Sequence, residues 1–234
     1  MYSRKVSDLI KSLSTASAER MKRVILLSGF CKMDHLRQLL EYIKQHVDLT
    51  PGEEAALLLK IRTRKFLKGH FVVQNGDVCK YENFVLAGCL RSFYIDNEGQ
   101  EHIIMFAVEN WWTADLGSFI TQKPADLNVQ CLEDSELGQI HYNDLQKLYE
   151  EIPKLERFFR IIIQKAFVAA QKRIVNNFSM EATARYVQFR EQYPGIEQRV
   201  PQYMVASYLG ITKEFLSKIR KKLAGQKRDL SDDV

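Results

Sequence analysis

The sequence of 234 residues predicts an α+β protein, in which a unit of short antiparallel strands precedes a long helix and a C-terminal helix-turn-helix. Three observations predict this order. Short runs rich in β-branched and aromatic residues, separated by glycine turns, lie between residues 61 and 140 and suggest a sandwich or small barrel. An uninterrupted helical pattern runs from Pro153 to about Phe178. Two short helical patterns joined by Gly210-Ile211-Thr212 follow near the end.

The net charge of +5 is unevenly distributed along the chain. Residues 1–32 hold 7 Lys and Arg against 2 Asp and Glu, a net charge of +5. Residues 33–152 hold 11 against 19, a net charge of −8, and residues 153–234 hold 16 against 8, a net charge of +8. An acidic body followed by a basic segment indicates two tasks, the second directed at a polyanion.

Composition divides the chain into four expected segments. Residues 1–32 form a loosely ordered arm, and Met33, which opens a more regular pattern, is a candidate translation start. Residues 33–152 form the strand-rich domain, 153–178 the long helix, and 179–234 the helix-turn-helix domain.

The cysteines and apolar runs indicate a cytoplasmic protein. Cys31, Cys79, Cys89 and Cys131 form no C-x-x-C pair, so they predict buried, reduced thiols rather than a zinc or redox site. No apolar run approaches the roughly 20 residues of a membrane-spanning helix, and the run at 24–31 is too short for a signal peptide.

The sequence contains no catalytic or metal-binding motif that would predict an enzyme. A Ser/His/Asp set, a glycine-rich phosphate loop and H-E-x-x-H are all missing, so we expect no enzyme, metal or cofactor. Glu133, His141 and Asp144 are close in sequence, but polar residues at a strand-to-helix junction are commonly surface residues.

Local signals place the remaining helices. Apolar residues recur at helical spacing from Asp34, and Thr50-Pro51-Gly52-Glu53 forms a capping box with proline at the first helical position. Ser179 is expected to cap a helix at 180–192, with Glu181 just inside it.

The long helix carries an apolar stripe that we expect to pair with a second copy of the chain. The alternative is that the stripe packs on the strand unit of its own chain. The stripe consists of Leu155, Phe159, Ile162, Ala166 and Ala169.

The segment after Pro201 has the geometry of a DNA-binding helix-turn-helix. Gly210 supplies a tight turn and Thr212 can cap the second helix. One face of that helix holds Phe215, Leu216, Ile219 and Leu223, and the other is polar and cationic. Such a second helix fits the DNA major groove, where its cations neutralise phosphates. The alternatives are a solvated amphipathic helix and a helix lying on a membrane, which would not need the turn.

The order of parts over about residues 34–224 resembles the Crp/Fnr family of bacterial transcription regulators. The resemblance rests on the glycine turns (Lys68-Gly69, Asn75-Gly76-Asp77, Leu86-Ala87-Gly88), on LEDSEL at 132–137, on the long helix and on ASYLGITKEFLSKIRK at 206–221. It implies a jelly-roll-like β-roll sensor related to cyclic-nucleotide-binding domains. It also implies a dimer, a palindromic operator in double-stranded DNA and RNA polymerase as a partner.

By the same resemblance, Lys213, Glu214, Ser217 and Lys218 occupy base-reading positions, and Gln202 and Thr212 face phosphates. Arg220, Lys221 and Lys222 add cations near the edges of the groove.

The chain departs from the cyclic-AMP-binding pattern of the family. Where that pattern has Gly-Glu-Leu and then Arg-Ser/Thr-Ala, this chain has Ala114-Asp115-Leu116 and Ala125-Asp126-Leu127. Replacing the phosphate-binding arginine removes a charge-assisted hydrogen bond of roughly 1.5–3 kcal/mol. We therefore expect no useful binding of cyclic AMP or cyclic GMP.

Other branches of the family are not indicated. An N-terminal cysteine cluster for iron–sulfur binding is missing, and His70, Cys79 and His102 are interpreted as ordinary strand residues rather than haem ligands. GQKRDLSDDV at 225–234 does not predict the two strands of a wing.

A pocket within the strand unit could still hold an apolar or differently charged effector, or nothing. Its candidate residues are Phe84, Phe93, Trp111, Trp112, Asp115 and Asp126. The sequence as a whole predicts a homodimeric DNA-binding regulator. The alternative is a β-roll dimer that acts as a protein-interaction module, with its helix-turn-helix kept only for packing.

Overall fold

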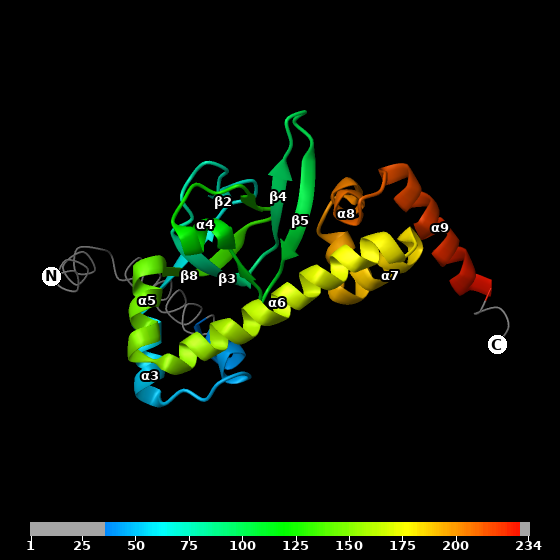
Figure 1. Ribbon diagram of the computed structural model, residues 1–234. Helices are drawn as coiled ribbons and strands as arrows, with labels where there is room; N and C mark the ends of the chain where they lie inside the picture. Colours follow the sequence, from blue (N-terminus) through cyan, green and yellow to red (C-terminus); the bar gives the residue numbers. More distant parts are fainter. Residues whose placement is uncertain (1–35, 230–234) are drawn as a thin grey trace, which may run out of the picture.

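The computed structural model describes residues 36–229, so the expected arm at 1–32 and residues 230–234 lie outside the described part (Figure 1). Residues 36–44 are helical. The elements that follow are α3 (Pro51–Lys60), β1 (Ile61–Phe66), β2 (Phe71–Val73), β3 (Tyr81–Ala87), β4 (Leu90–Ile95), β5 (Glu101–Ala107), β6 (Trp112–Thr113), α4 (Leu116–Thr121), β7 (Asn128–Cys131), β8 (Ser135–His141), α5 (Tyr142–Glu151), α6 (Pro153–Ser179), α7 (Ala182–Gln192), a 3-10 turn (Ile196–Gln198), α8 (Gln202–Leu209) and α9 (Lys213–Asp229).

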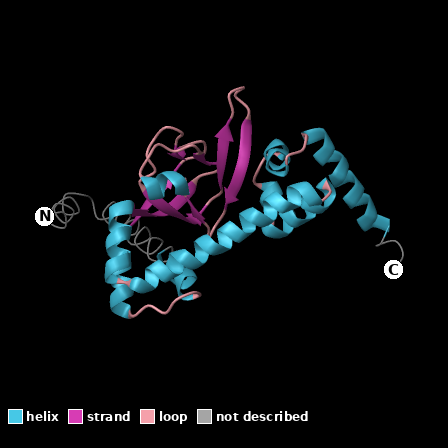
Figure 2. Cartoon of the chain, viewed as in Figure 1, coloured by secondary structure: helices cyan, strands magenta, loops and turns pink. Residues whose placement is uncertain are grey.

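The strands form two antiparallel four-stranded sheets, in the orders β1-β8-β3-β6 and β2-β7-β4-β5. Figure 2 shows them gathered at one end of the molecule, with the helices of the C-terminal part beyond them. The predicted β-roll followed by a long helix and further helices is confirmed. The interior of the roll is an apolar core, here called the first core, which includes Phe84, Leu86, Val129 and Leu137.

The two helices predicted before the strands are present, and both contribute apolar residues to the core of the roll. Leu39 and Ile43, four residues apart, are buried against the strands. Thr50 begins α3 with both bonds of the predicted capping box, because Thr50 Oγ1 accepts from the amide of Glu53 and the Glu53 carboxylate accepts from the amide of Thr50.

Gly88 joins β3 to β4 in a conformation that requires glycine. Its φ is +110°, and a Cβ built there would lie 2.2 Å from Ser135 Oγ and 2.8 Å from Ser135 Cα. Close approach of the two backbones therefore explains the Ala87-Gly88 turn signal in physical terms.

The long helix α6 runs from Pro153 to Ser179, as predicted. The expected cap at Ser179 is wrong. Ser179 is the last residue of α6, and its hydroxyl donates to the carbonyl of Val175 within that helix. Glu181 is instead the N-cap residue of α7, and its side chain makes no capping bond.

The C-terminal helices and the roll share a second apolar core. It combines residues of β4 and β5 with residues of α7, α8 and α9, including Phe93, Phe106, Phe189, Met204 and Leu216. No helix within residues 36–229 is long and apolar enough to cross a membrane.

Candidate nucleic-acid interface

Helices α8 and α9 are joined by a turn that the sequence dictates. Gly210 ends α8 in the left-handed conformation, with φ of 65°, and its amide donates to carbonyls of the last turn. Thr212 then begins α9, because its hydroxyl accepts from the amide of Phe215 at 3.2 Å. The two predicted capping roles are confirmed, and together they set the direction of α9.

One face of α9 is buried and the other is exposed. Leu216 and Ile219 are buried in the second core, and Leu223 packs partly against it. Phe215 departs from the prediction, since 47% of its surface is exposed. The face anchored to the protein is therefore narrower than the sequence pattern indicated.

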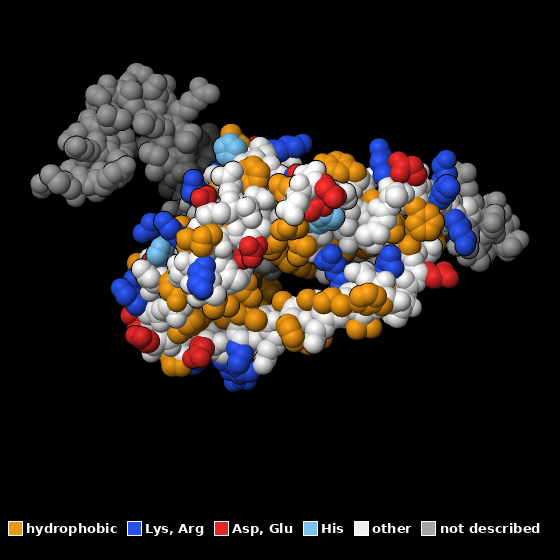
Figure 3. All heavy atoms as spheres, turned by 45° about the horizontal axis from the view of Figure 1, so that its top comes forward, with side chains coloured by type: hydrophobic (Ala, Val, Ile, Leu, Met, Phe, Trp, Pro, Cys, Tyr) orange, Lys and Arg blue, Asp and Glu red, His pale blue; other side chains and the backbone are white. Residues whose placement is uncertain are grey.

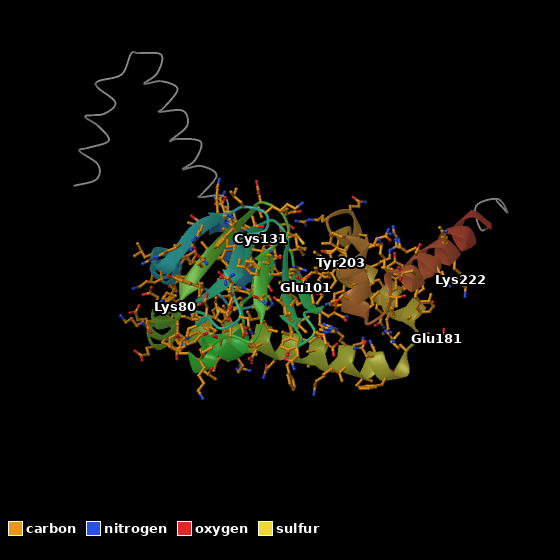
Figure 4. The ribbon with its side chains drawn as sticks, turned by 90° about the horizontal axis from the view of Figure 1, so that it is seen from above. Lys80, Glu101, Cys131, Glu181, Tyr203 and Lys222 are labelled. Carbon is orange, nitrogen blue, oxygen red and sulfur yellow. The ribbon has the colours of Figure 1, made fainter. Side chains whose placement is uncertain are left out.

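Most of the expected DNA-binding residues lie on the free side of α8 and α9. Ser217 is half-buried, and the exposed ones are Gln202, Thr212, Lys213, Glu214, Lys218, Lys221 and Lys222. Figure 3 shows Lys and Arg side chains gathered at the end of the molecule where α9 lies, and Figure 4 shows Lys222 there.

Arg220 differs from the other cations of α9. Its Nε lies 3.6 Å from a carboxylate oxygen of Glu197, which also pairs with Arg190 at 3.2 Å and accepts from the hydroxyl of Tyr186. Since its charge is used inside the C-terminal unit, Arg220 is less available to a phosphate than Lys221 or Lys222.

The β4–β5 hairpin is the surface on which the C-terminal unit docks. Phe106 of β5 lies within 5.8 Å of the rings of Tyr193 and Tyr208, measured between centroids, and Trp111 stacks on Tyr193 at 5.2 Å. Aromatic burial of this kind supplies most of the favourable free energy of such a contact.

An ion-pair cluster, here called the Arg199 bridge, fastens the same contact. The guanidinium of Arg199, just before α8, donates to both oxygens of Glu109 at 2.9 Å and to Glu133 at 2.5 Å. Glu109 follows β5 and Glu133 precedes β8, so one side chain of the C-terminal unit pairs with two loops of the roll.

The bridge shifts the protonation of its members. Burial disfavours the ionised form of Glu109, but hydrogen bonds from Arg199 and from backbone amides outweigh it and lower the pKa of that carboxyl. A lowered pKa means that this contribution to docking is present above the ordinary carboxyl pKa, roughly 4.3, and is lost as pH falls through the lowered value.

A cavity of about 370 Å³ lies beside this contact, between β5 and α8. The hydroxyl of Ser207 donates to the carbonyl of Glu101 and accepts from the amide of Ile103, both at 3.1 Å. Figure 4 shows Glu101 and Tyr203, which line the cavity, near each other where the hairpin meets α8.

The residues expected to line an effector pocket are distributed over two cores and the surface. Phe84 packs against Tyr42 and Trp112 in the first core, whereas Phe93 is buried in the second core. Trp111 packs on Tyr193 of the C-terminal unit. Asp115 is buried and hydrogen-bonded, and Asp126 is exposed. Phe84 and Phe93 therefore belong to different cores, and Trp111 packs against both.

Asp115 accepts hydrogen bonds from backbone amides of the segment 125–127, which the family resemblance aligns with Arg-Ser/Thr-Ala. Its Oδ1 accepts from the amide of Ser118 at 2.9 Å. Its Oδ2 accepts from the amides of Asp126 and Leu127, at 3.0 and 2.9 Å. The carboxylate of Asp115 thus accepts from both amides that follow Ala125, and Ala125 itself is buried.

Three of the five residues of the stripe expected to form a dimer pack against the strand unit of their own chain. Leu155 and Phe159 are buried in the first core of their own protomer, and Ile162 packs partly against it. Ala166 is exposed, and Ala169 lines a cavity formed with α7 and α8. The stripe therefore packs mainly within its own chain, which is the alternative that the sequence left open.

The cysteines of the roll are buried, and His102 pairs with a carboxylate. Cys79, Cys89 and Cys131 are free, buried thiols, as predicted, and burial raises the pKa of Cys79 to about 11. His102 Nε2 lies 2.7 Å from the Asp96 carboxylate. Within residues 36–229, no three His, Cys, Asp or Glu side chains are grouped as metal ligands.

Comparison with known proteins agrees with this architecture. Residues 63–151 match the family model of the cyclic nucleotide-binding domain. No curated protein matches the chain.

Solved structures extend the likeness beyond the roll. CLP of Xanthomonas campestris, described as a c-di-GMP-responsive global regulator, has a TM-score of 0.62 at 16% identity, covering 76% of this chain and 93% of CLP. FixK2 of Bradyrhizobium japonicum has a TM-score of 0.61 at 15% identity, covering 71% and 86% of the two chains. A putative regulator of the crp/fnr family from Eubacterium rectale has a TM-score of 0.59 at 14% identity, covering 76% and 85%. At these identities the likeness establishes a shared fold.

No local pattern in the sequence marks the residues that join the two parts of the molecule. Arg199 is separated from Glu109 by 90 residues and from Glu133 by 66. Arg173 on α6 donates to the carbonyls of Ile103 and Tyr208, and neither partner is encoded by a local pattern.

We expect Arg199→Ala to loosen the docking of the C-terminal unit by about 1 kcal/mol, because the bridge is a bidentate network at a partly exposed site. Hydrogen exchange at the β5 amides, in particular that of Ile103, should become faster. Arg62→Ala on the exposed side of β1 is the matched control and should leave this exchange unchanged. Equal exchange in wild type and Arg199→Ala would show that the aromatic contacts alone fix the unit.

Proposed function

We propose that this chain is a transcription regulator that binds duplex DNA as a homodimer, through α9, without a cyclic nucleotide. The observation that carries the proposal is the turn between α8 and α9. Gly210 and Thr212 set the direction of α9, Leu216 and Ile219 anchor it, and its lysines face away from the protein. A helix fixed by one face and cationic on the other has the properties of a major-groove reader.

The residues divide into two roles in this proposal. Lys213, Glu214, Ser217 and Lys218 lie in the first two turns of α9, where side chains reach base edges. Lys221 and Lys222, together with Gln202 and Thr212, contact phosphates and release counterions.

The two roles predict different effects of substitution. Lys218→Ala should cost about 1–3 kcal/mol at the base it reads and should relax specificity there. Lys222→Ala should weaken binding to every sequence alike and reduce the salt slope by about 1. Fluorescence anisotropy of cognate and scrambled duplexes over a salt series distinguishes these effects.

Lys147→Ala on α5 is the matched control, since Lys147 is exposed and remote from α9, and it should change neither quantity. If no duplex binds, or if both α9 variants behave as wild type, the alternative of a protein-interaction module becomes the better account.

Independence from cyclic nucleotides is supported by the surroundings of Asp115. A cyclic phosphate at this place would meet no arginine at position 125 and would have to displace a carboxylate from the amides of Asp126 and Leu127. Neither change is favourable, because an anion would approach an internal anion without a compensating cation.

Isothermal titration with cyclic AMP and cyclic GMP should therefore give no saturable heat at micromolar ligand. A loss of at least about 1.5–3 kcal/mol from the missing arginine already corresponds to roughly 10- to 150-fold in affinity. Micromolar affinity for either nucleotide would contradict this part of the proposal.

Dimerisation is supported by an apolar stripe on the other side of α6 from Leu155 and Phe159. Phe167 and Ile174 lie seven residues apart, as do Val168 and Val175, and about 60% of each surface is exposed. Phe178 continues the stripe and is 89% exposed, which is exceptional for phenylalanine. Figure 3 shows hydrophobic side chains in a row along the lower edge of the molecule, where α6 runs.

A second copy is the occupant that this stripe fits. Its spacing of seven residues is the repeat with which two helices pack along each other. A two-fold axis beside α6 would pair the stripe with itself and would present two α9 helices to one duplex.

Ile174→Glu should weaken the dimer by about 2 kcal/mol or more, because a two-fold interface receives two carboxylates in apolar surroundings. Ile120→Glu on α4 is a close control, since Ile120 is 59% exposed and Ile174 58%. Sedimentation velocity over a concentration series measures the difference. A wild-type chain that stays monomeric, or equal effects of the two variants, would exclude this stripe as the interface.

A further inference from the structure

A second cavity, of about 400 Å³, lies where α6, α7 and α8 meet. It is here called the junction cavity. Three cations line it, Lys172 and Arg173 from α6 and Arg185 from α7, against one acid, Glu191. Side-chain amides supply further polar groups, among them Asn176 and Gln188, and Phe189 and Tyr208 supply aromatic surface.

The positive charge of the junction cavity is not balanced by ion pairs. No ion pair among the described residues includes Lys172, Arg173 or Arg185. The guanidinium of Arg185 donates to the carbonyls of Met180 at 2.9 Å and Leu209 at 3.2 Å, and that of Arg173 donates to carbonyls of β5 and α8. Carbonyl dipoles orient these cations but carry no net charge, so the cavity remains cationic.

One donor of the cavity lining lacks a partner. Arg185 Nε is buried and has no hydrogen-bond acceptor, although both terminal nitrogens of the same guanidinium are engaged. Buried N–H groups are nearly always satisfied, and a charged one left without an acceptor is especially costly.

We propose that the junction cavity binds a small organic anion that carries carboxylate or phosphate groups. Its volume lies toward the lower end of the roughly 300–1,000 Å³ typical of small-molecule sites. Two guanidiniums and an ammonium match the oxygens of such groups, and the amides can bind polar substituents.

The position of the site connects it to the conformation of the chain. Arg185 bonds the carbonyl of Met180, at the junction between α6 and α7, and Asn176 Nδ2 donates to Gln188 Oε1 across that junction at 2.7 Å. A bound anion therefore ties the end of α6 to α7 and fixes the angle at which the last helices leave the long helix.

The residues of the site lie on a different side of α6 from the stripe of the proposed dimer. Lys172, Arg173 and Asn176 lie on the side of α6 that faces α7 and α8, whereas the stripe containing Phe167 and Ile174 is exposed on another side. Anion binding can thus be tested independently of dimerisation and of DNA.

Gln188→Glu tests the proposal with little disturbance of the fold. A glutamate at 188 keeps an oxygen to accept from Asn176 Nδ2, but it places a negative charge among the cations. Isothermal titration of the full chain with citrate, and separately with inorganic pyrophosphate, is the measurement. We expect saturable binding of at least one probe, at one site per chain, and at least tenfold weaker binding to Gln188→Glu.

Gln146→Glu on α5 makes the same change of charge at an exposed site remote from the cavity and should bind the probe as wild type does. Lys172→Gln should also weaken binding, and it serves if Gln188→Glu lowers the melting temperature, because Lys172 is exposed and forms no ion pair with the described residues. The proposal would be overturned if neither probe gave saturable binding, or if Gln188→Glu and Gln146→Glu bound equally well. The arginines would then serve only to bond backbone carbonyls at the ends of helices.

Discussion

The packing of the C-terminal helices on the β4–β5 hairpin determines where α9 lies. It buries aromatic rings of both parts in one core, and the Arg199 bridge adds ion pairs between them. Because Ser207 of α8 also bonds the backbone of β5, the helix before the turn is held directly by the hairpin. The direction of α9 is thus set by the roll as well as by its own turn. A change in the roll that moves the hairpin must move α9.

This coupling does not depend on the site at which related domains hold a cyclic phosphate. Here Asp115 satisfies the amides of Asp126 and Leu127 from within the chain. Two cavities lie instead at the junctions of α6, α7, α8 and β5, and the one between α6, α7 and α8 is lined by three cations.

Local chemistry made much of the fold predictable. The capping box at Thr50, the proline at 153, the glycine turns between strands, and the pair Gly210 and Thr212 each act over a few residues, and each has its expected role. The exposed lysines of α9 were predictable for the same reason, because an amphipathic pattern identifies a free face without naming its partner.

Contacts between distant segments were not predictable. Helix α6 is apolar on more than one side, so spacing alone could not decide that Leu155 and Phe159 face the roll while Ile174 and Phe178 are exposed. The residues expected to line an effector pocket are divided between two cores for a related reason, since successive residues of a strand point to opposite faces of the sheet. Ion pairs such as that of Arg199 with Glu109 form only when the two parts dock, and they produce no periodic pattern in the sequence.

The proposal that the chain binds DNA as a homodimer is best tested by selecting random duplexes with the purified chain. The selection is done without added ligand and at two salt concentrations. A homodimer that reads DNA through α9 should enrich a two-fold symmetric site whose half-sites lie about one helical turn, roughly 34 Å, apart. Enrichment should persist at the higher salt, because base contacts add to the salt-sensitive phosphate contacts. Recovery of no DNA at either salt would contradict the account and would favour a module that acts through a protein partner.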